Sequence, residues 1–158
     1  MIIIRKYSSK DRKGILSLMM EFLDYKQEVY DPYVMEFIDC SDKQGYAKSL
    51  LRWSLGKKEK VMYLAIDKKK IVGYIFGYTF ETPHNKSRKT GLIESYFVTK
   101  SYRRKGVGKI LYDELINWFK KKHCDSLDLY IFNGNSTTKK IYRNWGFKEI
   151  QTRMRKKI

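Results

Sequence analysis

The chain has 158 residues, of which 42% are hydrophobic and 15% aromatic, and it carries a formal net charge of +17. This length and apolar content predict a single folded domain over residues 1–158 and exclude a largely disordered chain. Because no apolar stretch approaches a membrane span, the N-terminus lacks a leader pattern and the two cysteines lack metal-ligand spacing, we expect a cytoplasmic protein without a metal ion or membrane contact.

The N-terminal part of the chain predicts a strand followed by helices. Residues 1–5 are typical of an opening strand, and apolar side chains then recur at three and four positions, which indicates a helix. The Asp31–Pro32 pair is expected to end this helix, because the residue before a proline disfavours helical backbone. A second helix is predicted over about residues 42–55, with Gly56 as its stop signal.

Residues 61–98 change to the pattern of strands. Residues 61–67 and 71–80 are rich in β-branched and aromatic side chains and are separated by three lysines, so we predict a hairpin. A third strand is predicted over residues 90–98. The short connections favour antiparallel pairing among these strands.

The C-terminal part alternates between helix and strand. A helix over about residues 106–123 precedes a strand at 127–132, a short helix that ends near Trp145, and a final strand at 147–156. The helical crossover makes strands 90–98 and 127–132 parallel. The sequence therefore predicts an α/β fold with a mixed, mainly antiparallel central sheet flanked by helices, in the order β-αα-βββ-α-β-α-β.

Charge is unevenly distributed along the chain. Residues 21–42 contain one cation, Lys26, among seven acidic side chains: Glu21, Asp24, Glu28, Asp31, Glu36, Asp39 and Asp42. With nearby tyrosines, these carboxylates would suit a pocket for a cationic ligand; the alternative is a solvated helix face that balances the basic remainder. The net charge of +17 also raises a nucleic-acid-binding protein as a rival, but the acidic segment and the lack of RNA-module aromatic signatures argue against it.

A basic turn with two glycines follows the strand predicted at residues 90–98. Residues 103–108 read RRKGVG, and the first N–H groups of a helix that begins near Gly106 have no partner within the helix. Glycine lets the backbone approach a ligand, and the basic side chains and the helix dipole attract a pyrophosphate. An ordinary basic helix start is the alternative. The turn is neither a P-loop nor a dinucleotide fingerprint, because Leu111 occupies the place of the third glycine.

Two segments, RRKGVG at residues 103–108 and NSTTKKIYRNWGF at residues 135–147, together resemble the GCN5-related N-acetyltransferase (GNAT) superfamily of acyl-CoA-dependent enzymes. Residues 103–108 match its [R/Q]-x-x-G-x-[G/A] signature. Residues 135–147 (NSTTKKIYRNWGF) follow its N-x-x-A-x-x-x-Y-x-x-x-G-F signature, except that Thr138 stands where alanine is usual. The resemblance implies the GNAT fold, acetyl-CoA as cosubstrate, no metal, and direct attack by an amine in a ternary complex without an acyl-enzyme.

The resemblance also implies where acetyl-CoA would bind. The pantetheine arm is expected along the strand before the turn, where an N–H near Val98 would stabilise the carbonyl oxygen as negative charge develops. The pyrophosphate is expected on the amides of residues 104–109, with Asn135 on the opposite wall. The expected cofactor-binding residues are Phe97, Val98, Arg103, Arg104, Lys105, Gly106, Val107, Gly108, Lys109 and Asn135.

Two side chains are candidates for proton transfer. A lysine-like amine is mostly protonated at neutral pH, so a base must take a proton before attack. Glu94 is the candidate base or water relay, since many relatives carry a carboxylate there; its alternatives are to orient the substrate or to face solvent. Tyr142 matches the family's general acid, which protonates the leaving thiolate; its alternative is a core tyrosine.

The first helices usually form the acceptor wall in this family. Tyr25, Glu28 and Tyr30 are therefore candidate substrate-binding residues. His84, in a turn between strands, is a further candidate for the acceptor pocket, although a surface histidine is the favoured interpretation. We expect a small cationic amine of polyamine, aminoglycoside or amino-acid type, with a protein lysine or N-terminal amine as the alternative. A CoA-binding sensor without turnover is a further alternative, and the sequence leaves monomer and homodimer open.

Overall fold

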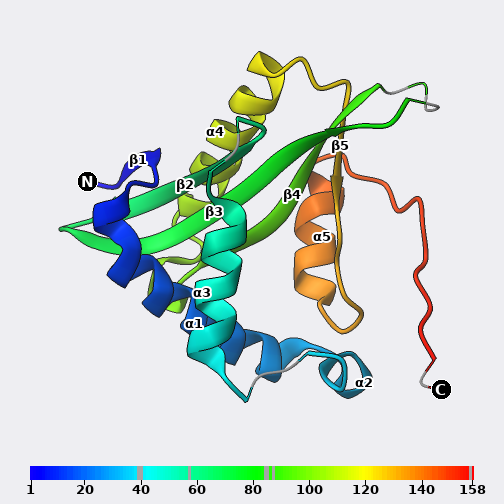
Figure 1. Ribbon diagram of the computed structural model, residues 1–158, viewed down its shortest axis with the longest axis horizontal. Coiled ribbons are helices and arrows are strands. Elements are labelled where there is room, and N and C mark those ends of the chain that lie inside the picture. The colour runs from blue at the N-terminus through cyan, green and yellow to red at the C-terminus, as the bar shows by residue number, and fades with distance from the viewer. Residues whose placement is uncertain (39–40, 57, 84–85, 87, 157) are drawn as a thin grey trace.

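The computed structural model describes residues 1–38, 41–56, 58–83, 86, 88–156 and 158 (Figure 1). Within them, one five-stranded sheet has its strands in sequence order. The strands are β1 (Ile3–Lys6), β2 (Lys60–Asp67), β3 (Lys70–Glu81), β4 (Lys89–Val98) and β5 (Ser126–Leu129). The pairs from β1 to β4 are antiparallel, and β4 pairs with β5 in parallel, as the short connections and the helical crossover predict.

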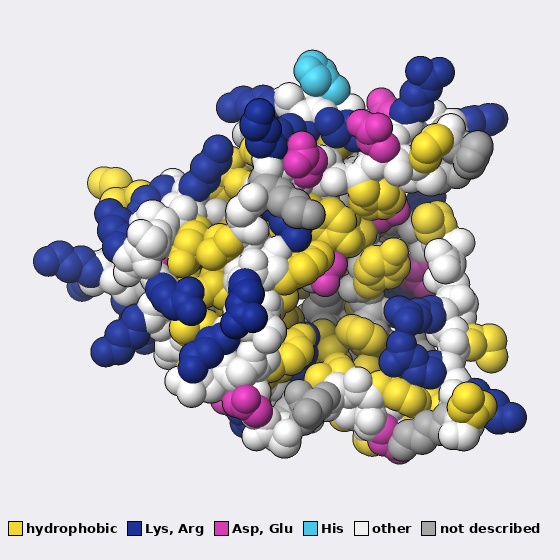
Figure 2. All heavy atoms as spheres, in the orientation of Figure 1, with side chains coloured by type: hydrophobic (Ala, Val, Ile, Leu, Met, Phe, Trp, Pro, Cys, Tyr) yellow, Lys and Arg dark blue, Asp and Glu magenta, His cyan; other side chains and the backbone are white. Residues whose placement is uncertain are grey.

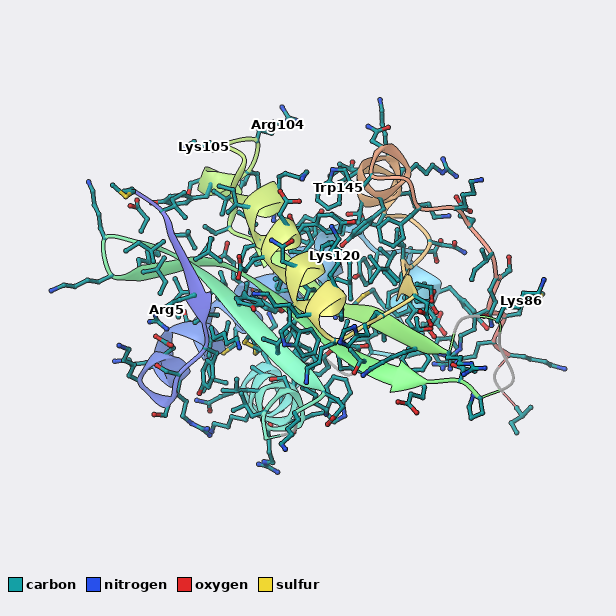
Figure 3. All side chains as sticks on the ribbon, turned by 90° about the horizontal axis from the view of Figure 1, so that it is seen from above. Arg5, Lys86, Arg104, Lys105, Lys120 and Trp145 are labelled. Carbon is teal, nitrogen blue, oxygen red and sulfur yellow. The ribbon has the colours of Figure 1, made fainter. Side chains whose placement is uncertain are left out.

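Helices cover both faces of this sheet. They are α1 (Arg12–Val29), α2 (Pro32–Met35), α3 (Lys43–Ser54), α4 (Val107–Lys121) and α5 (Ser136–Asn144), with 3₁₀ turns η1 (Ser9–Asp11) and η2 (Lys100–Tyr102). Figure 3 shows α4 and α5 on one side of the sheet and α1 and α3 on the other. The predicted α/β class with a mainly antiparallel sheet is therefore confirmed.

Each face of the sheet has its own apolar core. On the α4 side, Leu111, Leu115 and Phe119 are fully buried or nearly so and pack against the sheet. On the α1 side, Ile15 and Met19 pack against Leu64, Tyr74 and Phe76 of the central strands. Burying apolar side chains on both faces is the main driving force that fixes β2, β3 and β4 at the centre.

Helix boundaries follow the local capping chemistry. Asp31 Oδ1 accepts a hydrogen bond from the Tyr33 backbone N–H at 2.8 Å, and Pro32 occupies the first position of α2. Asp42 Oδ1 accepts from the Gly45 N–H at 2.8 Å at the start of α3. These caps satisfy N–H groups that a helix start leaves unpaired. The Asp31–Pro32 pair therefore ends α1 and begins a separate short helix.

The predicted final strand at residues 147–156 is wrong: this segment makes no strand pairing in the structure. Phe147 packs against the core on the α4 side, but beyond it Ile150 is 83% exposed and Met154 90% exposed, so the rest of the segment has no continuous apolar face to bury. The segment is instead anchored by the Arg143–Glu149 ion pair and by Tyr33 Oη, which donates to the Arg155 carbonyl at 2.9 Å. The strand predicted at 127–132 is also shorter, because β5 covers only Ser126–Leu129.

None of the described helices combines the length and apolar character that a bilayer crossing requires. The side chains that could ligate a metal ion do not gather in groups of three or more anywhere in the described part of the chain.

Candidate active site

A bulge in β4 opens the sheet next to β5. Ser95 pairs with Phe76 of β3 and Ile93 pairs with Gly77, so Glu94 is an extra residue without an opposite partner. The parallel pairing with β5 ends at Ile93. Beyond it, the far edge of β4 has no strand partner within the described residues, so its backbone groups face the opening between β4 and β5.

The glycine turn follows this open edge after the short turn η2. Arg104 and Gly106 adopt left-handed backbone, with φ angles of +59° and +79°. Figure 3 shows Arg104 and Lys105 at the tip of the turn, ahead of α4. Among the described residues, the backbone N–H groups of residues 104–109 have no hydrogen-bond acceptor. Successive free N–H groups beside a helix start and basic side chains fit a diphosphate, which is the group that the sequence predicts here.

A tyrosine side chain from β4 leaves room only for glycine at position 108. A Cβ built at Gly108 would overlap the Tyr96 hydroxyl, whereas a Cβ at Gly106 would meet no atom within 4 Å. The turn therefore needs glycine at its two positions for different physical reasons. Gly106 supplies a left-handed conformation, and Gly108 supplies space for Tyr96.

The other predicted cofactor residues serve the fold as well. Arg103 Nε donates to the Val98 carbonyl at 2.8 Å, and its guanidinium lies 4.3 Å from the ring centre of Tyr25. The Arg103 side chain thus ties the end of β4 to α1 instead of extending into the turn. Val107 is buried in the core, and Lys109 forms an ion pair with Asp113 one helical turn on.

The remaining cofactor candidates lie around the opening. Phe97 is buried and its ring centre lies 5.2 Å from that of Phe22 of α1. The Asn135 side chain accepts a hydrogen bond from the Thr138 N–H at 3.2 Å, so its oxygen caps α5. Its amide nitrogen is the part that would reach a ligand.

Tyr142 lies on α5, across the opening from the end of β4. Its side chain is 5% exposed, and its ring makes edge contacts with Trp145 and Phe147. Burial raises the pKa of the Tyr142 hydroxyl well above its ordinary value, and the nearby phenol of Tyr96 adds to this effect. The Tyr142 phenol is therefore un-ionised at physiological pH, which is the protonation state that a general acid requires.

Glu94 has the opposite requirement, because a base must be ionised. Partial burial raises the pKa of its carboxyl, while the ammonium groups of Lys26 and Lys60 act to lower it. The carboxylate is surface-accessible, so substrate or water can reach it. Glu94 therefore combines a raised pKa with access to solvent, two properties that an acid–base residue can use.

The predicted acceptor residues only partly come together. The Tyr25 ring lies 5.8 Å from that of Phe97, and the Tyr30 ring lies 5.2 Å from that of Phe132. Glu28 is exposed on α1, and His84 lies outside the described residues. Next to Tyr30 is a cavity of about 500 Å³, lined by Gln27, Tyr30, Pro32, Met35, Glu36 and Ile38.

Much of the acidic segment is used by local contacts. Asp31 and Asp42 cap helices, Asp24 pairs with Lys43, and Glu21 accepts a hydrogen bond from the Thr99 hydroxyl. Figure 2 shows hydrophobic side chains around a recess on this face, with Lys and Arg side chains both beside the recess and along the outer rim. The charge density that suggested a cationic pocket is thus spread over several helix ends.

Sequence reasoning missed one residue at this site, Lys26. It is only 9% exposed, although it is the single cation of the acidic segment. Its position on α1, four residues after Phe22 and four before Tyr30, places it on a face occupied by aromatic rings. A charged residue at such a position was the signal available in the sequence.

The profile described as "Acetyltransferase (GNAT) family" matches residues 22–147, so the chain belongs to that family. A curated relative is N-alpha-acetyltransferase 30 of Saccharomyces cerevisiae, 26% identical over 137 residues, which cover 84% of this chain and 77% of the yeast protein.

Solved structures share the fold. A mutant of the BH1408 protein of Bacillus halodurans has a TM-score of 0.83 at 19% identity, over 99% of each chain. An aminoglycoside N-acetyltransferase in complex with CoA has a TM-score of 0.71 at 16% identity, over 99% of this chain and 98% of the other. As a member of the GNAT family, the chain is an acetyl-CoA-dependent N-acetyltransferase.

Proposed function

We propose that this chain transfers the acetyl group of acetyl-CoA to a primary amine by direct attack, with the residues around the β4–β5 opening as its active site. The observation that carries the proposal is the continuity of that opening. The free edge of β4 leads, through the short turn η2, to residues 104–109, whose N–H groups lack acceptors in the described part of the chain. When bound there, acetyl-CoA supplies an activated thioester.

The residues of the opening have distinct roles in this proposal. The amides of residues 104–109 hold the diphosphate, and the edge of β4 near Val98 aligns the thioester and stabilises the developing oxyanion. Glu94 takes a proton from the acceptor amine, directly or through water. Tyr142, kept neutral by burial, gives a proton to the departing thiolate on the other side of the opening.

Two acceptor classes follow from different observations. A small cationic amine, such as a polyamine or an aminoglycoside, is favoured by the exposed carboxylates of Glu28 and Glu94 on the α1 side. The N-terminal amine of a protein is favoured by the similarity to the yeast N-alpha-acetyltransferase. The cavity beside Tyr30 is the candidate place for the part of the acceptor that follows the amine.

Calorimetry with acetyl-CoA and a thiol-release assay over an amine panel test the proposal. The panel contains spermidine, an aminoglycoside, free amino acids, and peptide pairs with free or blocked N-termini. We expect saturable 1:1 binding of acetyl-CoA and turnover with one class only. Absence of saturable binding would refute the proposed site, and release of thiol without any amine dependence would refute amine transfer.

A further inference from the structure

The ammonium group of Lys26 is enclosed by aromatic rings. Its Nζ lies 4.5 Å from the ring centre of Phe22, 5.9 Å from that of Tyr30 and 5.6 Å from that of Tyr46. It also donates a hydrogen bond to Tyr46 Oη at 3.4 Å. Lys26 is 9% exposed. Lysine is rarely buried to this extent unless its ammonium interacts with other groups, because removing an ammonium from water is costly.

The bulge in β4 turns Glu94 toward the same face as Lys26. Ile93 packs in the core on the α4 side, and Ser95 faces the α1 side, where its hydroxyl lies 2.8 Å from Tyr74 Oη. Regular alternation would put Ile93 and Ser95 on the same face, so the extra residue accounts for the change. Glu94 and Ser95 therefore both face α1 and α3.

Rings connect the two charged groups across this face. Phe22, which lies under the Lys26 ammonium, packs edge-on against Tyr74 with ring centres 6.4 Å apart. Tyr74 in turn shares a hydrogen bond with Ser95, the residue next to Glu94. The position of Lys26 is thus coupled through packed side chains to the bulge that presents Glu94.

Three titratable groups that interact with Glu94 come from three elements on this face: Lys26 from α1, Lys60 from β2 and Tyr78 from β3. Tyr130, which follows β5, interacts with Tyr78. The Lys60 ammonium donates to the Trp53 carbonyl at 2.6 Å and lies 4.0 Å from the Trp53 ring centre, so it is drawn toward the end of α3. Lys26 is the more deeply buried of the two cations.

We propose that Lys26 is a positioning residue for the active site, whose caged ammonium keeps the Glu94 side chain an ionised carboxylate facing the acceptor amine. This proposal rests on the proposed function only for the catalytic role of Glu94. The electrostatic coupling between the two side chains is a property of the protein without substrate. An unpaired carboxyl on this face would retain its proton to higher pH, because partial burial disfavours its charged form.

The test is a carbon-13 NMR titration of the glutamate side-chain carboxyls in the full chain, with the Glu94 signal assigned by its loss in Glu94→Gln. We compare the wild type with Lys26→Met, which removes the charge but keeps an apolar stem, and with Lys26→Arg, which keeps the charge. Lys48→Met, on the exposed surface of α3, is the matched control. If Lys26→Met does not fold, Lys26→Gln takes its place.

We expect the midpoint of the Glu94 titration to rise by about one pH unit in Lys26→Met and to stay near the wild-type value in Lys26→Arg and Lys48→Met. An unchanged midpoint in Lys26→Met would overturn the proposal, as would an equal rise in Lys48→Met. This readout needs no turnover, so it separates failure of the coupling from failure of the proposed function. If the chain is active, the acid limb of kcat/KM should move with the NMR midpoint, and a limb that stays fixed would overturn the positioning role.

Discussion

Replacement of Gly108 by alanine tests the geometry of the glycine turn. The added Cβ would overlap the Tyr96 hydroxyl, so either Tyr96 or the start of α4 must move. Overpacking of this kind costs roughly 1–3 kcal/mol, and the better helix propensity of alanine offsets up to about 1 kcal/mol. We therefore expect the free energy of unfolding to fall by about 1–2 kcal/mol.

Removing the Tyr96 hydroxyl should relieve this clash. In Tyr96→Phe the nearest ring atom to the new Cβ is Cζ, at 3.2 Å, a contact that a small shift can accommodate. The double variant Gly108→Ala/Tyr96→Phe should therefore be more stable than the sum of the single effects predicts, by about 1 kcal/mol.

Gly106→Ala is the matched control, because its Cβ would meet no atom within 4 Å but its φ of +79° disfavours any side chain. That strain costs about 1–2 kcal/mol and does not involve Tyr96. With the double variant Gly106→Ala/Tyr96→Phe added, urea unfolding of the five variants and the wild type measures both double-mutant cycles. Calorimetry with CoA shows whether the amides of the turn have moved. The steric explanation would be refuted if Tyr96→Phe restored the stability of Gly106→Ala and of Gly108→Ala by the same amount. It would also be refuted if Gly108→Ala were as stable as the wild type.

Three further predictions concern other parts of the molecule. Tyr142→Phe should lower kcat about 10²-fold or more, the usual contribution of a general acid, while calorimetry shows unchanged CoA affinity; wild-type turnover would remove Tyr142 from the mechanism. Asp11 forms two hydrogen bonds of 2.7 Å with Arg5, which hold the pKa of its carboxyl well below the usual range. Because the pKa is lower in the folded state, the stability lost in Asp11→Asn, about 2 kcal/mol at pH 7, should shrink below about pH 4; a loss independent of pH in urea unfolding would contradict this. Gly134 has a φ of +90°, and a Cβ there would lie 2.9 Å from the Asp31 backbone nitrogen. Gly134→Ala should therefore lower the midpoint of thermal unfolding by several degrees. An unchanged midpoint would show that the backbone moves at no cost to accommodate the Cβ.

The regular elements could be predicted from sequence because their signals are local. The strand predicted at residues 71–80 is β3 at Lys70–Glu81, and that predicted at 90–98 is β4 at Lys89–Val98. Dense runs of β-branched and aromatic residues decide such strands without reference to the rest of the chain. The segment at 147–156 failed because a strand also needs a partner edge and an apolar face, and its residues provide no such face.

The candidate site was predictable where it depends on the backbone of one segment. Left-handed Gly106 at the start of α4 and the cap at Asn135 follow from residues only a few positions away. The sequence does not predict that Gly108 leaves space for the Tyr96 side chain, because the two residues meet only when α4 packs against β4. The same holds for Arg103, whose side chain bonds to the end of β4.

The sequence by itself determined the order of the main elements as far as α5, the glycine turn and the family, since periodicity, capping and motif spacing act over short stretches of chain. Only the tertiary structure decided that β4 bulges at Glu94, that β4 and β5 separate after Ile93, and that Lys26 is enclosed by rings on the Glu94 side. These features depend on how segments that are distant in sequence pack together and exclude water. The cost of burying a charge depends on the side chains around it, and a local sequence pattern does not reveal which side chains those are.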